Sequence, residues 1–109
     1  MYEGWFAEHN FAFAMTEFDG RSDYGPFLEE NIPAGGLFTG AEQLKTVNER
    51  SIFQGLANSP YDSCYHKSCD TVENINRQGL SVMAGAAAQV VFDLAMQENL
   101  RGFLNGTVV

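Results

Sequence analysis

The chain has 109 residues, of which 45% are hydrophobic, and it carries a formal net charge of −8. This length and composition are typical of one globular domain and not of a disordered chain. The six basic residues are scattered along the sequence, whereas phosphate binding needs clustered Lys and Arg, so we expect no nucleic acid partner.

The N-terminal residues predict a helix followed by a strand. Aromatic side chains recur on one face of residues 2–10, which indicates a helix that stops at Asn10. Large and small side chains then alternate from Phe11 to Thr16, the pattern of a strand of about six residues.

A turn and a short helix are predicted next. Ser22 or Asp23 can cap a helix that runs through Phe27 and Leu28. Pro26 is tolerated in the first turn of such a helix.

The middle of the chain predicts one more strand and a long loop. The stretch NIPAGGLFTGAE breaks the short helix and leads into a short buried strand around Leu37 and Phe38. Residues 41–63 predict a loop with room for one helical turn, and loops of that length inside a domain are usually functional.

The strongest pattern in the sequence predicts a helix over residues 77–97. Asp70 and Glu73 have the spacing of a capping box, and Asn76 is a second candidate cap. Apolar side chains recur at steps of three and four residues and form one face, which we expect to be core and not a cofactor site. The members of this face are Met83, Ala86, Ala87, Val90, Val91 and Leu94.

Strands that alternate with helices favour an α/β layered architecture. Only two strands are predicted here, whereas a parallel sheet is covered by helices on both faces, and an unpaired sheet edge favours aggregation. The sequence therefore predicts one part of an α/β fold.

The only two cysteines lie in the stretch SPYDSCYHKSCDTVENI. Cys64 and Cys69 are too far apart for a C-x-x-C redox motif, and with His66 they supply three ligands where structural zinc takes four. A disulfide that closes the loop CYHKSC is favoured, with structural zinc as the alternative, because two lone cysteines suit an oxidising compartment. Spacing alone favours a surface or core role for His66 and core packing for Tyr65.

Three stretches together resemble the C-terminal part of the secreted and vacuolar di-zinc aminopeptidases, the leucine aminopeptidase and aminopeptidase Y-like metallopeptidases. They are GRSDYGPFLEENIPAGGLFTGAE, DSCYHKSCDTVENIN and the closing alanine-rich helix. The similarity extends from about Trp5 to Leu104. It implies that residues 1–109 are the C-terminal part of one catalytic domain with a three-layer α/β/α fold, a mixed central sheet flanked by helices, which is incomplete in this chain.

The resemblance assigns roles to the cysteine loop. His66 matches the last zinc ligand of the family, and Tyr65 matches the tyrosine whose hydroxyl stabilises the oxyanion of the tetrahedral intermediate. Cys64 and Cys69 match a short disulfide that holds both groups beside the metals.

The resemblance also implies a substrate pocket. Gly20, Arg21 and Phe38 match residues that line the pocket for the first side chain of the substrate. Phe38 is apolar where a leucine side chain would lie, and Arg21 could bind a carboxylate or form a salt bridge to a neighbouring acid. Gly35 and Gly36 would let the backbone enter the pocket without steric clash.

The implied reaction is hydrolysis of peptides with a free N-terminus, in which two zinc ions activate a water and a glutamate is the general base. The family uses two histidines and three carboxylates as ligands, and only His66 is present here. The acidic pair Glu29 and Glu30 lies outside the family's catalytic pair. We therefore expect the isolated chain to be inactive.

Two function classes remain open at this point. The chain is either a fragment of a zinc-dependent aminopeptidase, whose candidate partner is the missing N-terminal part of the catalytic domain, or a stand-alone, non-catalytic secreted binding module that keeps the stapled loop. Purification with a partner chain would support the first class. Monomeric behaviour, cooperative melting and indifference to zinc would support the second.

The resemblance and the cysteines imply an extracellular or vacuolar location. No run of about 18 apolar residues is present, which predicts no membrane span. The opening stretch MYEGWFAEHN lacks the basic start and apolar run of a signal peptide. The tripeptide NGT at Asn105 fits the acceptor pattern for N-glycosylation, a pattern that is common by chance.

Overall fold

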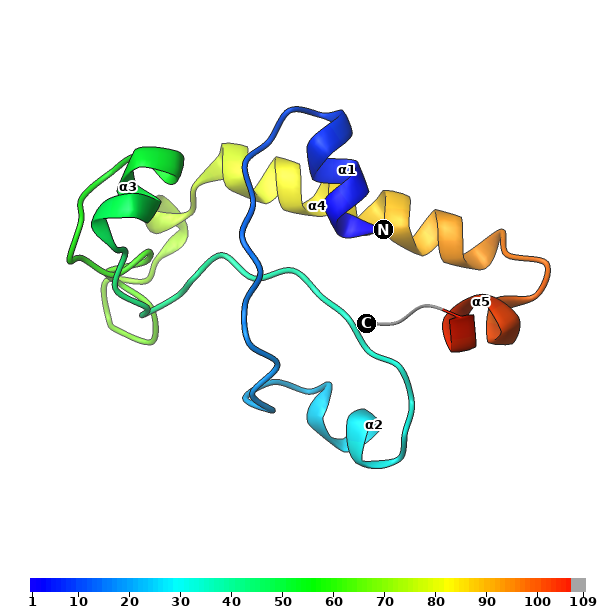
Figure 1. Cartoon of the computed structure of the whole chain (residues 1–109). Helices are drawn as coiled ribbons and strands as arrows, with labels where there is room; N and C mark the ends of the chain where they lie inside the picture. Colours follow the sequence, from blue (N-terminus) through cyan, green and yellow to red (C-terminus); the bar gives the residue numbers. More distant parts are fainter. Residues whose placement is uncertain (107–109) are drawn as a thin grey trace.

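The structure is a computed structural model that describes residues 1–106 (Figure 1). Its elements are α1 (Tyr2–Glu8), α2 (Gly25–Glu29), α3 (Val47–Phe53), the 3-10 helix η1 (Val72–Asn74), α4 (Arg77–Ala95) and α5 (Leu100–Gly106). The only β pairing within this range is a single antiparallel bridge between Leu44 and Pro60.

Helix α1 packs against α4 in the middle of the molecule (Figure 1). A Cβ atom at Gly85 of α4 would lie 3.4 Å from the Trp5 ring, an ordinary van der Waals distance, so the indole lies directly on this face of the helix. Trp5 also stacks on His9, with ring centroids 4.1 Å apart. The predicted helix is confirmed. It ends at Glu8, and Asn10 follows with a φ of 57°, a left-handed conformation that does not continue a helix.

Helix α4 confirms the strongest sequence pattern. The Asn76 side chain caps it by accepting a hydrogen bond from Gly79 N at 2.9 Å. Ala86 and Val90 are buried, with 0% and 5% exposure. Val91 was predicted on the same face but is 64% exposed, because successive helical residues differ in direction by about 100°.

Length and composition also make α4 the one helix in the described part of the chain that could cross a membrane. The sequence analysis had found no continuous apolar run long enough for a span. Core helices of soluble proteins share this length and composition, and α4 packs against α1 in this structure.

Neither predicted strand forms within residues 1–106. Residues 11–16 and the stretch around Leu37 and Phe38 belong to no strand, and Phe38 is 49% exposed where burial was predicted. A strand exists only through hydrogen bonds to a neighbouring strand, and the described residues supply no such neighbour. The α/β class is therefore not confirmed by this structure.

The short helix α2 is confirmed, but its predicted caps are wrong. Tyr24 occupies the N-cap position in place of Ser22 or Asp23, and no side chain caps the helix. The Ser22 carbonyl instead accepts a main-chain hydrogen bond from Gly25 N at 3.1 Å. Pro26 lies in the first turn, as predicted.

A 3-10 turn replaces the capping box predicted at Asp70 and Glu73. The Thr71 hydroxyl donates to the Glu73 carboxylate at 2.7 Å. Asp70 instead accepts from the side-chain amide of Asn74 at 3.3 Å, so it stabilises η1 and not the start of α4.

Residues 41–63 are more ordered than the predicted long loop. They contain α3, which begins with a complete capping box. Thr46 Oγ1 accepts from Glu49 N at 3.1 Å, and the Glu49 carboxylate accepts from Thr46 N at 2.7 Å. This pair satisfies two main-chain N–H groups that would otherwise lack partners at the helix start.

Main-chain pairing brings the two ends of this region together. Tyr61 N donates to Gln43 O at 3.0 Å, and Asp62 N donates to Ala41 O at 2.8 Å. Gly40 makes the corner before this pairing, with a φ of 99°, and a Cβ atom there would overlap the Tyr61 ring. The stretch GLFTGAE is therefore tied to the residues that open the cysteine loop.

Candidate active-site segment

The cysteine loop is closed by a disulfide between Cys64 and Cys69, with a Cα–Cα distance of 5.3 Å. The disulfide prediction is confirmed. The alternative of structural zinc is wrong, because both sulfur atoms are in the covalent bond. A loop of this size gains only about 2 kcal/mol from closure, so the main effect of the disulfide is to position the side chains inside it.

The stapled loop presents Tyr65 and His66 side by side. Their ring centroids are 4.1 Å apart, with the ring planes at 51°. His66 has a φ of 56°, a left-handed conformation that is uncommon for residues other than glycine and that occurs often at functional sites. Both side chains are exposed, so a phenol hydroxyl and an imidazole are available on one surface.

Asp62 holds the start of this loop. Its Oδ1 atom accepts from Cys64 N at 2.9 Å and from the side-chain amide of Asn74 at 3.1 Å. These bonds, the one from Asn74 first, lower the pKa of the Asp62 carboxyl from its ordinary 3.8. The sequence analysis missed this residue, although an Asp two positions before the amide that it binds is a common turn signal.

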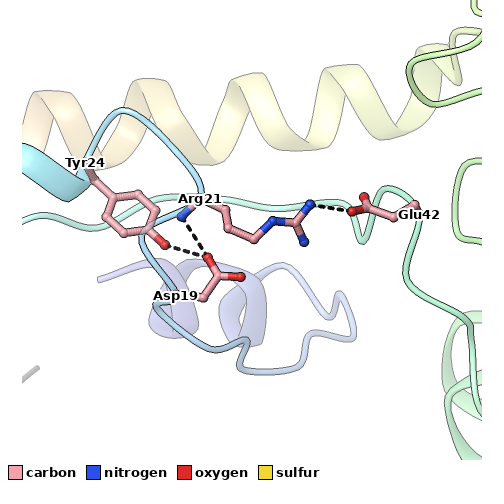
Figure 2. A network of polar contacts seen from close by, with 4 residues as sticks. All are labelled: Asp19, Arg21, Tyr24 and Glu42. Atoms are coloured by element: carbon pink, nitrogen blue, oxygen red, sulfur yellow. Dashed lines mark hydrogen bonds and ion pairs between the residues drawn. The ribbon is translucent and has the colours of Figure 1, made fainter.

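A second polar cluster fixes the Gly20–Arg21 segment (Figure 2). Asp19 Oδ1 accepts from Arg21 N at 3.0 Å and from the Tyr24 hydroxyl at 3.2 Å, and the same hydroxyl accepts from Gly20 N at 2.9 Å. Gly20 has a φ of 78°, which suits glycine. The two predicted pocket residues are thus held by the hydrogen bonds that their main-chain N–H groups donate to Tyr24 and Asp19.

Arg21 forms an ion pair with Glu42, with a nitrogen–oxygen distance of 2.6 Å (Figure 2). Of the two interpretations of Arg21, the structure shows the salt bridge. The hydrogen bond lowers the pKa of the Glu42 carboxyl and raises that of the guanidinium. His66 also lowers the pKa of Glu42 through its charge, and Tyr65 raises that of Arg21, so the ion pair lies within electrostatic range of the stapled loop.

The other predicted positions are not gathered around this loop. Phe38 lies in an extended segment and has no ring contact within the described part of the chain. A Cβ atom at Gly35 or Gly36 would meet nothing within 4 Å, so the predicted steric reason for these glycines is not found here. Asn105 is exposed in α5, and Thr107 of its acceptor tripeptide lies outside the described residues.

The residues described by the structure do not fit a zinc ion by themselves. Between residues 1 and 106 there is no group of three His, Cys, Asp or Glu side chains that could hold a metal. A catalytic zinc takes three protein ligands and keeps a further position open. His66 is therefore at most a single ligand. Two surface hollows formed by described residues lie elsewhere, one beside Arg50 of α3 and one between α1 and α4.

Comparison with known proteins places most of the chain in a single group of peptidases. The sequence profile "Peptidase family M28" matches residues 6–91. Leucine aminopeptidase 2 of Trichophyton rubrum is 41% identical over 103 residues, which are 94% of this chain and 20% of that protein. The protein of the same name from Trichophyton equinum is 42% identical over the same shares. An aminopeptidase of Pseudomonas aeruginosa is 41% identical over 96 residues, 88% of this chain and 18% of that protein. The chain spans about a fifth of the length of these relatives.

Proposed function

Because the chain belongs to peptidase family M28, we propose that it is the C-terminal part of the catalytic domain of a zinc-dependent aminopeptidase, which releases N-terminal residues from peptides. The observation that carries this proposal is the stapled loop, in which Tyr65 and His66 lie side by side at 4.1 Å. The loop lies inside the region that is matched by the family and by aminopeptidases at 41% identity.

In this proposal Tyr65 is the catalytic residue that the chain supplies. Tyr65 is 37% exposed, and its hydroxyl can donate a hydrogen bond to the oxyanion that develops during amide hydrolysis. Removal of one such donor costs about 10²–10³-fold in kcat in measured enzymes. The disulfide and Asp62 limit the movement of the loop, so the donor is positioned before the substrate binds.

His66 has the role of one metal ligand, and the other ligands and the general base come from outside this chain. The described residues bring no second and third ligand to the imidazole. The relatives are about five times as long as the chain, which leaves room for the remaining groups. We therefore propose that the isolated chain is inactive and that the complete domain binds two zinc ions.

The proposed substrate has an uncharged, leucine-like first side chain, and this preference is argued from Arg21, Glu42 and Phe38. The Arg21 charge is balanced by Glu42 at 2.6 Å, so little positive charge remains to attract an acidic side chain. Phe38 is 49% exposed and offers apolar surface in the segment that resembles the pocket wall. The Tyr24 hydroxyl accepts a hydrogen bond from Gly20 N and so fixes the backbone just before Arg21.

We also propose that the chain is made in the secretory pathway and works outside the cell or in a vacuole. Support comes from the disulfide between Cys64 and Cys69, because disulfides persist in oxidising compartments and are rare in the cytosol.

A chimera tests the proposed roles without relying on association between separate chains. The 103 aligned residues of the Trichophyton rubrum enzyme are replaced by those of this chain. The chimera should release leucine from a leucine aryl amide.

Tyr65→Phe should lower kcat about 10²–10³-fold with little change in KM, and His66→Ala should lower both zinc content and activity. Tyr2→Phe in α1 is the matched control and should have no effect. Full kcat after Tyr65→Phe in a folded, zinc-loaded chimera would contradict the assignment of Tyr65.

A further inference from the structure

Two basic side chains, Lys45 and Arg50, are held at the turn that follows α3. Lys45 Nζ donates to Gln54 O at 2.7 Å, and Arg50 Nε donates to Gly55 O at 3.3 Å. The two carbonyls belong to successive residues, so both cations lie at one turn. The chain has only six Lys and Arg residues and a formal net charge of −8. This turn is therefore a local concentration of positive charge on an acidic molecule.

The backbone of this turn limits where the guanidinium can lie. Gln54 and Gly55 have φ values of 63° and 79°, and Gln54 N donates to Arg50 O at 2.8 Å. A Cβ atom at Gly55 would lie 3.0 Å from Lys45 Nζ, so the ammonium group lies directly against the turn. The Arg50 side chain is thus positioned before any ligand binds, which reduces the entropy that binding costs.

Unused hydrogen-bond donors of the turn border a surface hollow of about 390 Å³, lined by Arg50, Ser51, Gln54 and Gly55. We call it the Arg50 hollow. Within residues 1–106, the terminal nitrogens of Arg50 and the main-chain N–H of Gly55 take part in no hydrogen bond or ion pair. The Ser51 hydroxyl donates to Val47 O at 3.2 Å. The guanidinium, the Gln54 side-chain amide and the Gly55 N–H therefore remain as donors for a ligand.

No carboxylate of the described chain is paired with Arg50. The only ion pair within residues 1–106 joins Arg21 and Glu42. Glu49 is the acid closest to this turn in its interactions, and its carboxylate accepts from Thr46 N at 2.7 Å. The pKa of Glu49 is lowered from its ordinary 4.5, first by this bond and last by the charge of Lys45. Glu49 is thus occupied by the start of α3, and Arg50 is left without a carboxylate partner.

A carboxylate fits these donors better than a phosphate. The planar guanidinium donates two parallel hydrogen bonds to a planar carboxylate, a geometry that lysine does not offer. The net charge of −8 repels a phosphate, which carries nearly two negative charges at neutral pH, more strongly than a singly charged carboxylate.

The turn and the stapled loop belong to one hydrogen-bonded unit. Lys45 N donates to Ser59 O at 3.0 Å, and Asn58 N donates to Lys45 O at 2.7 Å. The same pairing continues through Tyr61 and Asp62 to the start of the cysteine loop. Helix α3 and the yellow-green residues of that loop lie at the same end of the molecule (Figure 1). A ligand in the Arg50 hollow would therefore be held by the unit that also carries Tyr65.

We propose that the Arg50 hollow binds a carboxylate group of a peptide through the Arg50 guanidinium, the Gln54 amide and the Gly55 N–H. The carboxylate chemistry rests on the donors of the turn, whereas the choice of a peptide as ligand rests on the proposed function. A peptide carries carboxylates at its C-terminus and on acidic side chains, and the test distinguishes these two sources.

The direct test is an NMR titration of the oxidised chain with three peptides. They are Leu-Gly-Gly with a free C-terminus, its C-terminal amide, and Leu-Gly-Asp with a C-terminal amide. The Arg50 Nε–H and Gly55 N–H signals should shift with at least one of the two peptides that carry a carboxylate, with a Kd on the order of 1–10 mM. The neutral Leu-Gly-Gly amide should cause no shift. A response to the first peptide identifies the C-terminus as the source, and a response to the third identifies the side chain.

Matched variants assign the binding to the guanidinium. Arg50→Gln should weaken binding at least tenfold, and Arg50→Lys, which keeps the charge but not the two parallel bonds, should weaken it less. Arg77→Gln is the control, because it removes the charge of another exposed arginine. It should leave the Kd within about twofold of the parent chain.

The chimera with the Trichophyton rubrum enzyme shows whether the hollow contributes to substrate binding. The readout is the ratio of kcat/KM for the peptide that responds in the titration to kcat/KM for the leucine aryl amide, which has no carboxylate. This ratio should fall about 3–10-fold in Arg50→Gln and stay unchanged in Arg77→Gln.

Four results would overturn the proposal. They are equal shifts with the neutral amide, shifts that persist in Arg50→Gln, a response to inorganic phosphate but to neither carboxylate peptide, and a kcat/KM ratio that Arg50→Gln leaves unchanged. Failure of this site is distinguishable from failure of the proposed function, because the titration needs no turnover. Binding to the chain together with an inactive chimera would overturn only the catalytic roles. An active chimera without binding at Arg50 and Gly55 would overturn only the Arg50 hollow.

Discussion

Single residues show which parts of the site are encoded locally. Spacing alone favoured a surface or core role for His66 and core packing for Tyr65, and their proposed roles come from the resemblance of three stretches taken together. The structure adds that both side chains lie inside a disulfide-closed loop of six consecutive residues. Glu42 could not be assigned, because its partner Arg21 lies 21 positions away and nothing in the sequence fixes which acid pairs with it. Asp62 was detectable from its turn signal, two positions before the amide that it binds.

The Arg21–Glu42 ion pair predicts a dependence on pH. The pKa of Glu42 is lowered from its ordinary 4.5, first by the hydrogen bond from Arg21. When pairing lowers the pKa of a carboxyl, the pair is fully formed at pH values above the ordinary pKa. The pairing is lost as the pH falls through the lowered pKa. The Arg21 side-chain signals in an NMR titration should therefore stay constant near neutral pH and shift as the pH falls through the lowered pKa of Glu42, with a midpoint below its ordinary 4.5.

Glu42→Gln should remove this shift, whereas Glu17→Gln, in an extended segment, should leave it unchanged. Both side chains of the pair are largely exposed, 70% and 47%, so solvent screening keeps the effect on overall stability small. A shift that persists unchanged in Glu42→Gln would contradict the assignment of the pair.

At the scale of elements, α1, α2 and α4 were predicted from the sequence, whereas the two predicted strands did not form within residues 1–106. Helix α4 is specified by its own periodicity and by the Asn76 cap, and both are local features. A strand depends on a partner that is distant in sequence, so the alternation in residues 11–16 could specify an extended backbone but not a sheet. Within residues 41–63 the sequence analysis allowed one helical turn and did not place it, although the capping box of α3, Thr46 and Glu49, is visible in the sequence.

Among Gly35, Gly36 and Gly40, Gly40 should be the glycine at which substitution by alanine has the largest effect. Its φ of 99° disfavours any side chain, and a Cβ atom would overlap the Tyr61 ring. Gly40→Ala should therefore displace the pairing between residues 41–43 and 61–62, with a loss of stability of at least about 1 kcal/mol. Faster amide exchange at Tyr61 and Asp62 would report this loss.

Gly36→Ala is the matched control, because a Cβ atom there meets nothing within 4 Å. It should leave the same amides unchanged. Equal exchange rates in the two variants would show that the corner does not depend on the glycine.

At the scale of the whole molecule, the chain resembles one part of a larger domain. The sequence analysis reached this view from the small number of strands. The accessible area of 8758 Å² supports it independently, because a compact monomer of 12.0 kDa exposes about 6,000 Å². Residues 1–106 form helices and one isolated β bridge, so the three-layer sheet that the resemblance implied is not confirmed. In the proposed function the site is divided in the same way, with Tyr65 as oxyanion donor and His66 as one ligand contributed by this chain.

The most direct measurement is an aminopeptidase assay of the purified, oxidised chain alone on a leucine aryl amide with added zinc. We predict no release of leucine by chain that circular dichroism shows to be helical, because one imidazole does not hold a catalytic zinc. Zinc-dependent turnover that is abolished by His66→Ala would contradict this account, since it would mean that copies of this chain assemble a complete site by themselves.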